Sequence, residues 1–282
     1  MNVAYRAARA QGAATRSLYR RMIRRIVGRP VRQSRKIPVE VYSFSGERYL
    51  PEQVACVRSF VRHVGVPDKF TIVSDGSYTE SSREVLRRTS DCVTVVDWDA
   101  FAVDLPPYVR AFADRQAMGK KLAVLLSMPV NRATIYTDAD ILFFPAASEL
   151  ARLAESDGGR FWYLPDCMAS LDDSILRDEA ERERPVNAGF MLLKERLDWD
   201  APLRRLAEYP GSPSWATEQT LVHLAMHRNN ALPLSPDKFV LSVSDQFVYK
   251  DHYAKRDIAL RHYVNNVRHK FWQTIPFQGG RN

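Results

Sequence analysis

Two aspartates that directly follow a buried strand could hold a metal ion. Ala133-Thr134-Ile135-Tyr136 is short, apolar and β-branched, as is typical of a buried strand in a parallel sheet. Asp138 and Asp140 come next, at the strand end where open α/β sheets place their ligands. If the chain turns there, both carboxylates can approach one hard cation such as Mn²⁺ or Mg²⁺. The alternative is a pair of solvated acids in a turn.

The segments around this pair alternate between strands and helices. Strands are predicted over 39–44, 70–76, 92–96, 133–136, 188–193 and 259–264, and helices over 51–64, 81–88, 116–127 and 217–228. Residues 172–184 form a charged helix or loop in this interpretation. The βαβ rhythm predicts an α/β fold with a mostly parallel, Rossmann-like central sheet flanked by helices.

The positive charge lies almost entirely at the N-terminus. The 282 residues carry a net charge of +8, yet residues 1–36 hold eleven Arg and Lys side chains and no Asp or Glu. The remaining body therefore has a net charge of −3, which argues against a nucleic-acid partner. We expect two parts, a basic amphipathic segment over 1–36 and a single folded domain over 37–282.

The basic segment also has an apolar stripe at helical spacing. Its members are Leu18, Tyr19, Met22, Ile23, Ile26 and Val27. A basic amphipathic helix of this kind is typical of segments that bind an anionic membrane surface. The alternatives are a disordered arm, or a helix that packs on the body through its stripe.

The expected location is the cytoplasm, with peripheral membrane association through residues 1–36. No apolar run has the length of a membrane span, and the N-terminus lacks the apolar core of a secretory signal. Cys56, Cys92 and Cys167 are odd in number and lack metal-ligand spacing, so we expect reduced, packed thiols. An Arg-rich, acid-free N-terminus is also typical of organelle transit peptides.

Four segments follow one another along the chain: Thr137-Asp138-Ala139-Asp140, Asn187-Ala188-Gly189, Glu218-Gln219, and His262 with Lys270-Phe271-Trp272. In this order they resemble the nucleotide-sugar glycosyltransferases of the GT-A fold, and most of all glycosyltransferase family 8, the group that includes glycogenin and bacterial galactosyltransferases. The likeness extends from about Val39 to Trp272.

The resemblance implies that Asp138, Asp140 and His262 bind Mn²⁺, or Mg²⁺, which grips the diphosphate of a UDP-sugar. Two carboxylates and an imidazole suit such a cation and leave positions for phosphate oxygens. The alternative for His262 is a satisfied core histidine.

The closing motif departs from the family pattern His-x-x-Gly-x-x-Lys-Pro-Trp. Asn265 stands where the pattern has Gly, and Arg268 stands where it has Lys. The segment Lys270-Phe271-Trp272, which resembles the pattern's Lys-Pro-Trp, comes two residues later than the pattern requires. Either Arg268 or Lys270 could contact the diphosphate, and the neighbouring tryptophan favours Lys270. Both could instead be surface cations.

The resemblance assigns the sugar to Asn187, Glu218 and Gln219. In the family the Asn reaches the donor sugar, the acid holds its hydroxyls, and the Gln lies beneath the anomeric carbon. Glu218 replaces the commoner Asp and is longer by one methylene. Structural roles are the alternatives, a turn for Asn187 and a solvated helix start for Glu218.

Three further residues are weaker candidates for the donor region. Lys121 resembles a family lysine near the donor, and Arg115 could serve the same region. Asp75, which ends a predicted strand, could lie near the nucleotide base. A structural role is the alternative for each of them.

Together these observations predict metal-dependent transfer of a hexose from a UDP-sugar to an acceptor hydroxyl, with retention of configuration. The acceptor would be a glycan, a lipid-linked molecule or a protein. Two alternatives remain: a degenerate, non-catalytic protein that binds nucleotide or glycan, and a Mg²⁺ phosphatase of the haloacid-dehalogenase type. The latter also uses Asp-x-Asp, but normally on its first strand.

Overall fold

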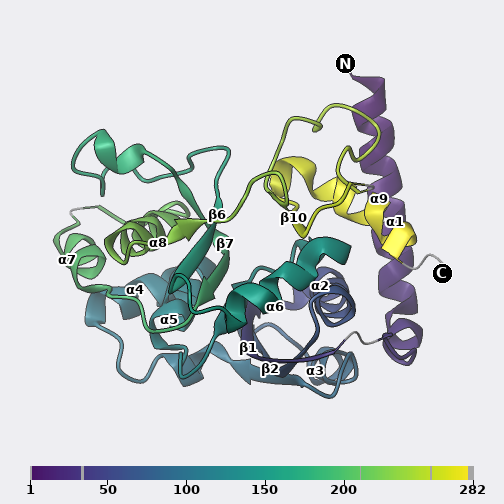
Figure 1. Ribbon diagram of the computed structural model, residues 1–282, viewed down its shortest axis with the longest axis horizontal. Helices are drawn as coiled ribbons and strands as arrows, with labels where there is room; N and C mark the ends of the chain where they lie inside the picture. Colours follow the sequence, from purple (N-terminus) through teal and green to yellow (C-terminus); the bar gives the residue numbers. More distant parts are fainter. Residues whose placement is uncertain (1, 33–34, 210, 255, 279–282) are drawn as a thin grey trace.

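The computed structural model describes residues 2–32, 35–209, 211–254 and 256–278, and their centre is a seven-stranded sheet (Figure 1). The strand order is β3-β2-β1-β4-β7-β6-β8. The strands are β1 Lys36–Ser45, β2 Val66–Ser74, β3 Val93–Asp97, β4 Thr134–Thr137, β6 Phe161–Pro165, β7 Val186–Leu193 and β8 Leu232–Pro233.

The sheet is parallel from β3 to β4 and mixed beyond it. β7 runs antiparallel to both β4 and β6, while β8 is parallel to β6. A second sheet of three short strands has the order β5-β10-β9, with β5 over Ile141–Phe143, β9 over Phe239–Val240 and β10 over Leu260–His262. This small sheet starts directly after the Asp-x-Asp turn and ends at His262.

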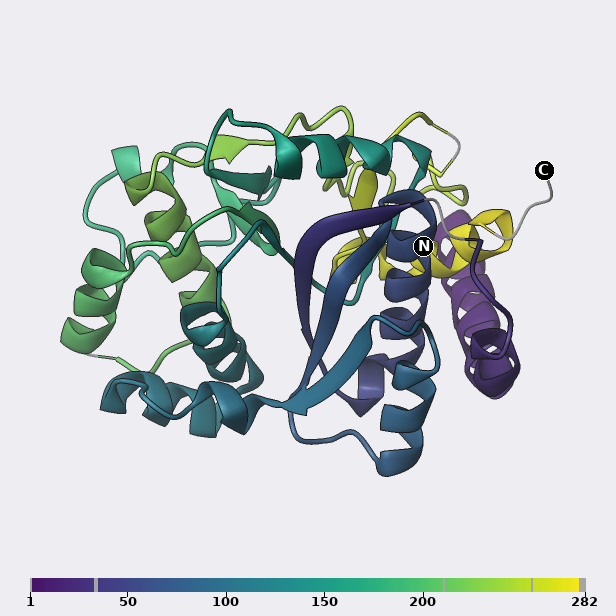
Figure 2. The same ribbon diagram turned by 60° about the horizontal axis from the view of Figure 1, so that its bottom comes forward.

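Helices cover both faces of the large sheet (Figure 2). One face packs against α2 Leu50–His63, α3 Glu80–Arg87 and α6 Ser148–Glu155. The other packs against α4 Pro107–Arg115, α5 Ala117–Ser127, α7 Asp200–Glu208 and α8 Thr217–Arg228. The alternation along β1 explains this arrangement, because Val41 enters the first core and Tyr42 the second.

The predicted α/β class with a mostly parallel, helix-flanked sheet is confirmed, and the differences lie in the second half of the chain. The strand expected over 259–264 contains only three residues, because it pairs with the short β5. Between residues 172 and 184 the only helical turn among the described residues is Ala180–Arg182. The helix α4 over Pro107–Arg115 was not among the predicted helices.

The basic N-terminal segment forms one helix, α1 over Val3–Val27, that packs along α9 over Arg268–Gln278 (Figure 1). Ile23 is buried in the main core, and the Tyr19 ring centroid lies 5.2 Å from that of Trp272. At Gly12 an added Cβ would lie 2.5 Å from the backbone oxygen of His269, so a side chain there would separate the two helices. The described residues of this segment therefore form a helix packed on the body and not a disordered arm.

Two members of the apolar stripe do not take part in this docking. Leu18 and Met22 are exposed, while Ile23 and Val27 are buried. Within the described ranges, no helix combines the length and the apolar composition needed to cross a membrane.

Candidate functional site

Asp138, Asp140 and His262 come together at the ends of three strands. One ligand atom from each lies within 4.8 Å of the others. The His262 Nε2 is 3.1 Å from Oδ1 of Asp140 and 3.8 Å from Oδ2 of Asp138. The antiparallel pairing of β10 with β5 causes this, because it sets His262 opposite Ile141, the neighbour of Asp140.

A hydrogen bond from behind fixes which nitrogen of His262 faces the carboxylates. The Asn187 Oδ1 accepts from the Gly189 backbone N–H at 2.9 Å and lies 2.9 Å from His262 Nδ1. An amide oxygen only accepts, so Nδ1 carries a proton and donates it. In the neutral ring, Nε2 therefore presents its lone pair to two carboxylates, which a cation would stabilise. Two carboxylates and one such imidazole fit Mn²⁺ or Mg²⁺.

Gly189 makes this hydrogen bond possible, because it has no side chain and leaves room for the His262 ring and the Asn187 amide. A Cβ at this position would lie 2.4 Å from Cε1 of His262 and 2.8 Å from Oδ1 of Asn187. The backbone oxygen of Gly189 also accepts from the Asp138 N–H at 2.7 Å. The strand β7 thus positions two of the three candidate ligands.

Lys121 and Arg268 bring positive charge to the same carboxylates. Lys121 is buried, with Nζ 3.2 Å from Oδ1 of Asp138 and 3.6 Å from Oε1 of Glu218. Arg268 pairs with Asp140 and also donates to the Tyr49 hydroxyl at 3.2 Å. These contacts offset the repulsion between acids that lie so close together.

Burial and charge act in opposite directions on two of the acids. Burial would raise the pKa of Asp140, but the Arg268 guanidinium and His262 outweigh it and hold that pKa below its usual range. For Glu218, burial dominates over the nearby Lys121 and raises the pKa to about 7. Asp140 is therefore ionised at neutral pH, whereas the pKa of Glu218 lies close to neutral pH.

Asn187 and Gln219 share a fourth acid, Asp166, that the sequence interpretation missed. The Gln219 Nε2 donates to Asp166 Oδ2 at 2.8 Å and to the Ser170 backbone oxygen at 2.9 Å. The Asn187 Nδ2 lies 3.4 Å from the same Asp166 oxygen. Asp166 directly follows β6, so the signal that singled out Asp138, a carboxylate after an apolar strand, also applied here.

One cleft of about 170 Å³ contains most of the predicted nucleotide-binding residues. Its lining includes Asp75, Lys121, Asp138, Asp140 and Arg268. Asp75 directly follows β2, and its Oδ1 accepts from the Ser77 N–H at 2.9 Å.

Two predicted residues lie outside this cluster. The preferred cation Lys270 does not line the cleft, because it is fully buried and donates to the backbone oxygens of Val248 and Lys250, at 2.8 and 2.9 Å. Arg115 ends α4 as an exposed residue and does not line the cleft.

Replacing Arg268 and Lys270 separately should separate their roles. We expect Arg268→Gln to weaken UDP binding on the order of tenfold, because it removes a cation from the cleft. Lys270→Gln should mainly lower the free energy of unfolding, since it removes a buried donor to two carbonyls. Calorimetric titration and urea unfolding of both variants measure these effects. Weaker UDP binding in Lys270→Gln alone would restore the sequence-based preference.

No protein-family model matches this chain, and no curated protein matches it. Solved structures do resemble it in fold. The galactosyltransferase LgtC, in complex with donor and acceptor sugar analogues, has a TM-score of 0.56 and 13% identity, covering 86% of this chain and 97% of that chain. Mouse xyloside xylosyltransferase 1 has a TM-score of 0.55 and 14% identity, and the match covers 82% of this chain and 99% of that chain. These likenesses show that the chain has the fold of the GT-A glycosyltransferases.

Proposed function

We propose that this protein transfers a hexose from a UDP-sugar to an acceptor hydroxyl in a reaction that needs a divalent metal. The observation that carries the proposal is the grouping of Asp138, Asp140 and His262 at one strand edge of a GT-A fold. Assignment to family 8, and retention of configuration, rest on the sequence resemblance and are part of the proposal.

Asp138, Asp140 and His262 would hold Mn²⁺ or Mg²⁺ in this proposal. The bound metal would neutralise the negative charge that develops on the diphosphate leaving group. Asn187 keeps Nε2 of His262 free for it by accepting from Nδ1. Arg268 supports the same diphosphate, because its guanidinium lies in the cleft beside Asp140.

Glu218, Gln219 and Asn187 are proposed to orient the donor sugar. The Glu218 Oε1 is buried and accepts no hydrogen bond among the described residues, although Lys121 lies 3.6 Å away. A buried acceptor without a donor carries a desolvation cost that a sugar hydroxyl would remove. Gln219 and Asn187 hold each other and Asp166, so their amides reach the cluster in a fixed orientation.

A degenerate, non-catalytic transferase is the second candidate, and one observation favours it. Arg268 pairs directly with Asp140, so a cationic side chain already neutralises one of the two carboxylates that would bind metal. Such a protein would bind nucleotide or glycan without transferring sugar.

Slow hydrolysis of UDP-sugars in the absence of an acceptor tests these possibilities. We expect UDP release from UDP-glucose or UDP-galactose with Mn²⁺, and none after chelation with EDTA, because the leaving diphosphate needs the metal. Released UDP can be followed by chromatography, with p-nitrophenyl phosphate as the comparison substrate. Preferential cleavage of that phosphomonoester would indicate the phosphatase. If neither substrate is turned over while UDP still binds, the protein is the degenerate transferase.

A further inference from the structure

The loop between β9 and β10 carries three consecutive apolar side chains that face solvent. Phe247, Val248 and Tyr249, which we call the apolar tip, are 56%, 37% and 42% exposed. A run of three large exposed apolar residues costs solubility and marks an interaction surface rather than a folding requirement.

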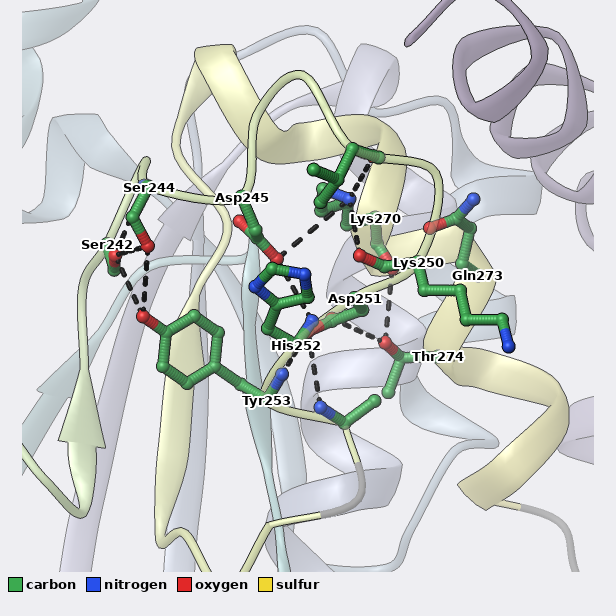
Figure 3. Close-up of polar contacts among 12 residues, drawn as sticks. Ser242, Ser244, Asp245, Lys250, Asp251, His252, Tyr253, Lys270, Gln273 and Thr274 are labelled. Atoms are coloured by element: carbon green, nitrogen blue, oxygen red, sulfur yellow. Dashed lines mark hydrogen bonds and ion pairs between the residues drawn. The ribbon is translucent and has the colours of Figure 1, made fainter. Parts of the chain in front are cut away.

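Buried polar contacts hold the backbone beneath the tip (Figure 3). Lys270 reaches up from α9 and donates to the backbone oxygens of Val248 and Lys250. Asp245, fully buried, pairs with Arg261 at 2.7 Å. Figure 3 shows the Lys250 side chain pointing away from this cluster. These contacts hold the loop backbone in place, while the side chains of the apolar tip remain exposed.

The start of α1 lies against the apolar tip. The Asn2 Nδ2 donates to the Phe247 backbone oxygen at 2.8 Å, and the Tyr5 and Phe247 ring centroids are 5.4 Å apart. Val3, the first residue of the helix, is 79% exposed. The tip thus borders the N-terminal end of α1 beside Tyr5, on the side of the helix that faces the body.

The outward face of α1 is basic. Residues that pack on the body recur at Ala8, Gly12, Ile23 and Val27, and the helical repeat places positions 3, 18, 21 and 25 on the opposite side. The helix holds seven arginines and no acid. Arg21 and Arg25 are exposed, and their side chains make no hydrogen bond or ion pair among the described residues. Their charges are available to an external partner.

We propose that the apolar tip and the outward face of α1 dock the protein on an anionic lipid bilayer. Aromatic and aliphatic side chains favour the headgroup boundary, and arginines are attracted to anionic lipid. The charge pattern fits this partner, because α1 holds seven arginines and no acid, whereas residues 37–282 have a net charge of −3. This inference does not depend on the proposed transfer reaction.

Co-sedimentation of the full chain with vesicles tests the docking. The vesicles contain phosphatidylglycerol and phosphatidylcholine, or phosphatidylcholine alone. We expect binding to the anionic vesicles only, falling as salt rises. The double change Arg21→Gln, Arg25→Gln should weaken it on the order of tenfold at low salt. Val248→Ser, Tyr249→Ser should weaken it by a similar factor at every salt concentration, because its contribution is apolar.

Matched variants elsewhere on the surface control for loss of charge and of apolar area. Arg160→Gln with Arg177→Gln removes two exposed arginines, and Val103→Ser removes an apolar side chain that is 81% exposed. Both should sediment like the original chain, and circular dichroism confirms that each variant is folded. Equal sedimentation of tip variants and controls, or no binding of the original chain, would overturn the proposal. Self-association that the tip variant abolishes, without vesicle binding, would instead identify a contact between two copies.

Discussion

Asp140→Asn should strongly weaken metal-dependent binding of UDP while leaving the protein folded. The variant keeps the shape of the side chain but removes one of the two carboxylate charges that would hold the cation. We expect the affinity for UDP in the presence of Mn²⁺ to fall by on the order of 100-fold, about 2.7 kcal/mol. Calorimetric titration of UDP with and without Mn²⁺ measures it.

Two variants calibrate this result. Asp97→Asn removes a half-exposed carboxylate that pairs with Arg83 and does not line the cleft, so binding should be unchanged. His262→Ala should weaken binding less than Asp140→Asn, because it removes one neutral ligand and leaves both carboxylate charges in place. Binding by Asp140→Asn at the original affinity would exclude the proposed metal site.

Two acids of the proposed metal site could be picked out from the sequence because their signal is local. Asp138 and Asp140 follow a short apolar strand, and the end of such a strand is where ligands collect. His262 depended on the resemblance, since nothing in its own neighbourhood distinguishes a ligand from a core histidine. The pairing of β10 with β5 that brings it to Asp140 is a long-range contact.

The different placement of Arg268 and Lys270 has a simple geometric cause. Arg268 begins α9, and Lys270 follows two residues later. Two residues along a helix turn a side chain by about 200°, so the two cations point to opposite sides. Arg268 therefore reaches Asp140, and Lys270 reaches the loop below the apolar tip. The sequence placed Lys270 beside a tryptophan but could not show where the helix begins.

The mixed half of the sheet and the docking of α1 were not predictable in this way. β7 reads as an apolar strand whichever direction it runs, and its antiparallel pairing with β4 and β6 is set by contacts far apart in the chain. For α1 the periodicity identified an apolar stripe, while the packing on α9 depends on the space at Gly12 and on Trp272. Periodicity identifies a buried face but not the partner that covers it.

Gly189→Ala should damage the site more than the fold. The new methyl group would lie 2.4 Å from Cε1 of His262 and 2.8 Å from Oδ1 of Asn187, so the imidazole has to move. A shift of His262 breaks the hydrogen bond that directs Nε2 toward Asp138 and Asp140. We expect Mn²⁺-dependent UDP binding to weaken on the order of tenfold or more, because outer contacts of this kind tune metal affinity by 10 to 100-fold.

Comparing this loss with the loss of stability separates a site effect from a folding effect. Overpacking a buried position costs about 1 to 3 kcal/mol, which urea unfolding of the metal-free protein measures. Gly158→Ala is the matched control, because an added Cβ there meets nothing within 4 Å. We expect Gly158→Ala to bind UDP and Mn²⁺ like the original chain. If Gly189→Ala also keeps the original affinity, then His262 does not need its present position to bind the metal, and the part assigned to Asn187 in directing the ring is wrong.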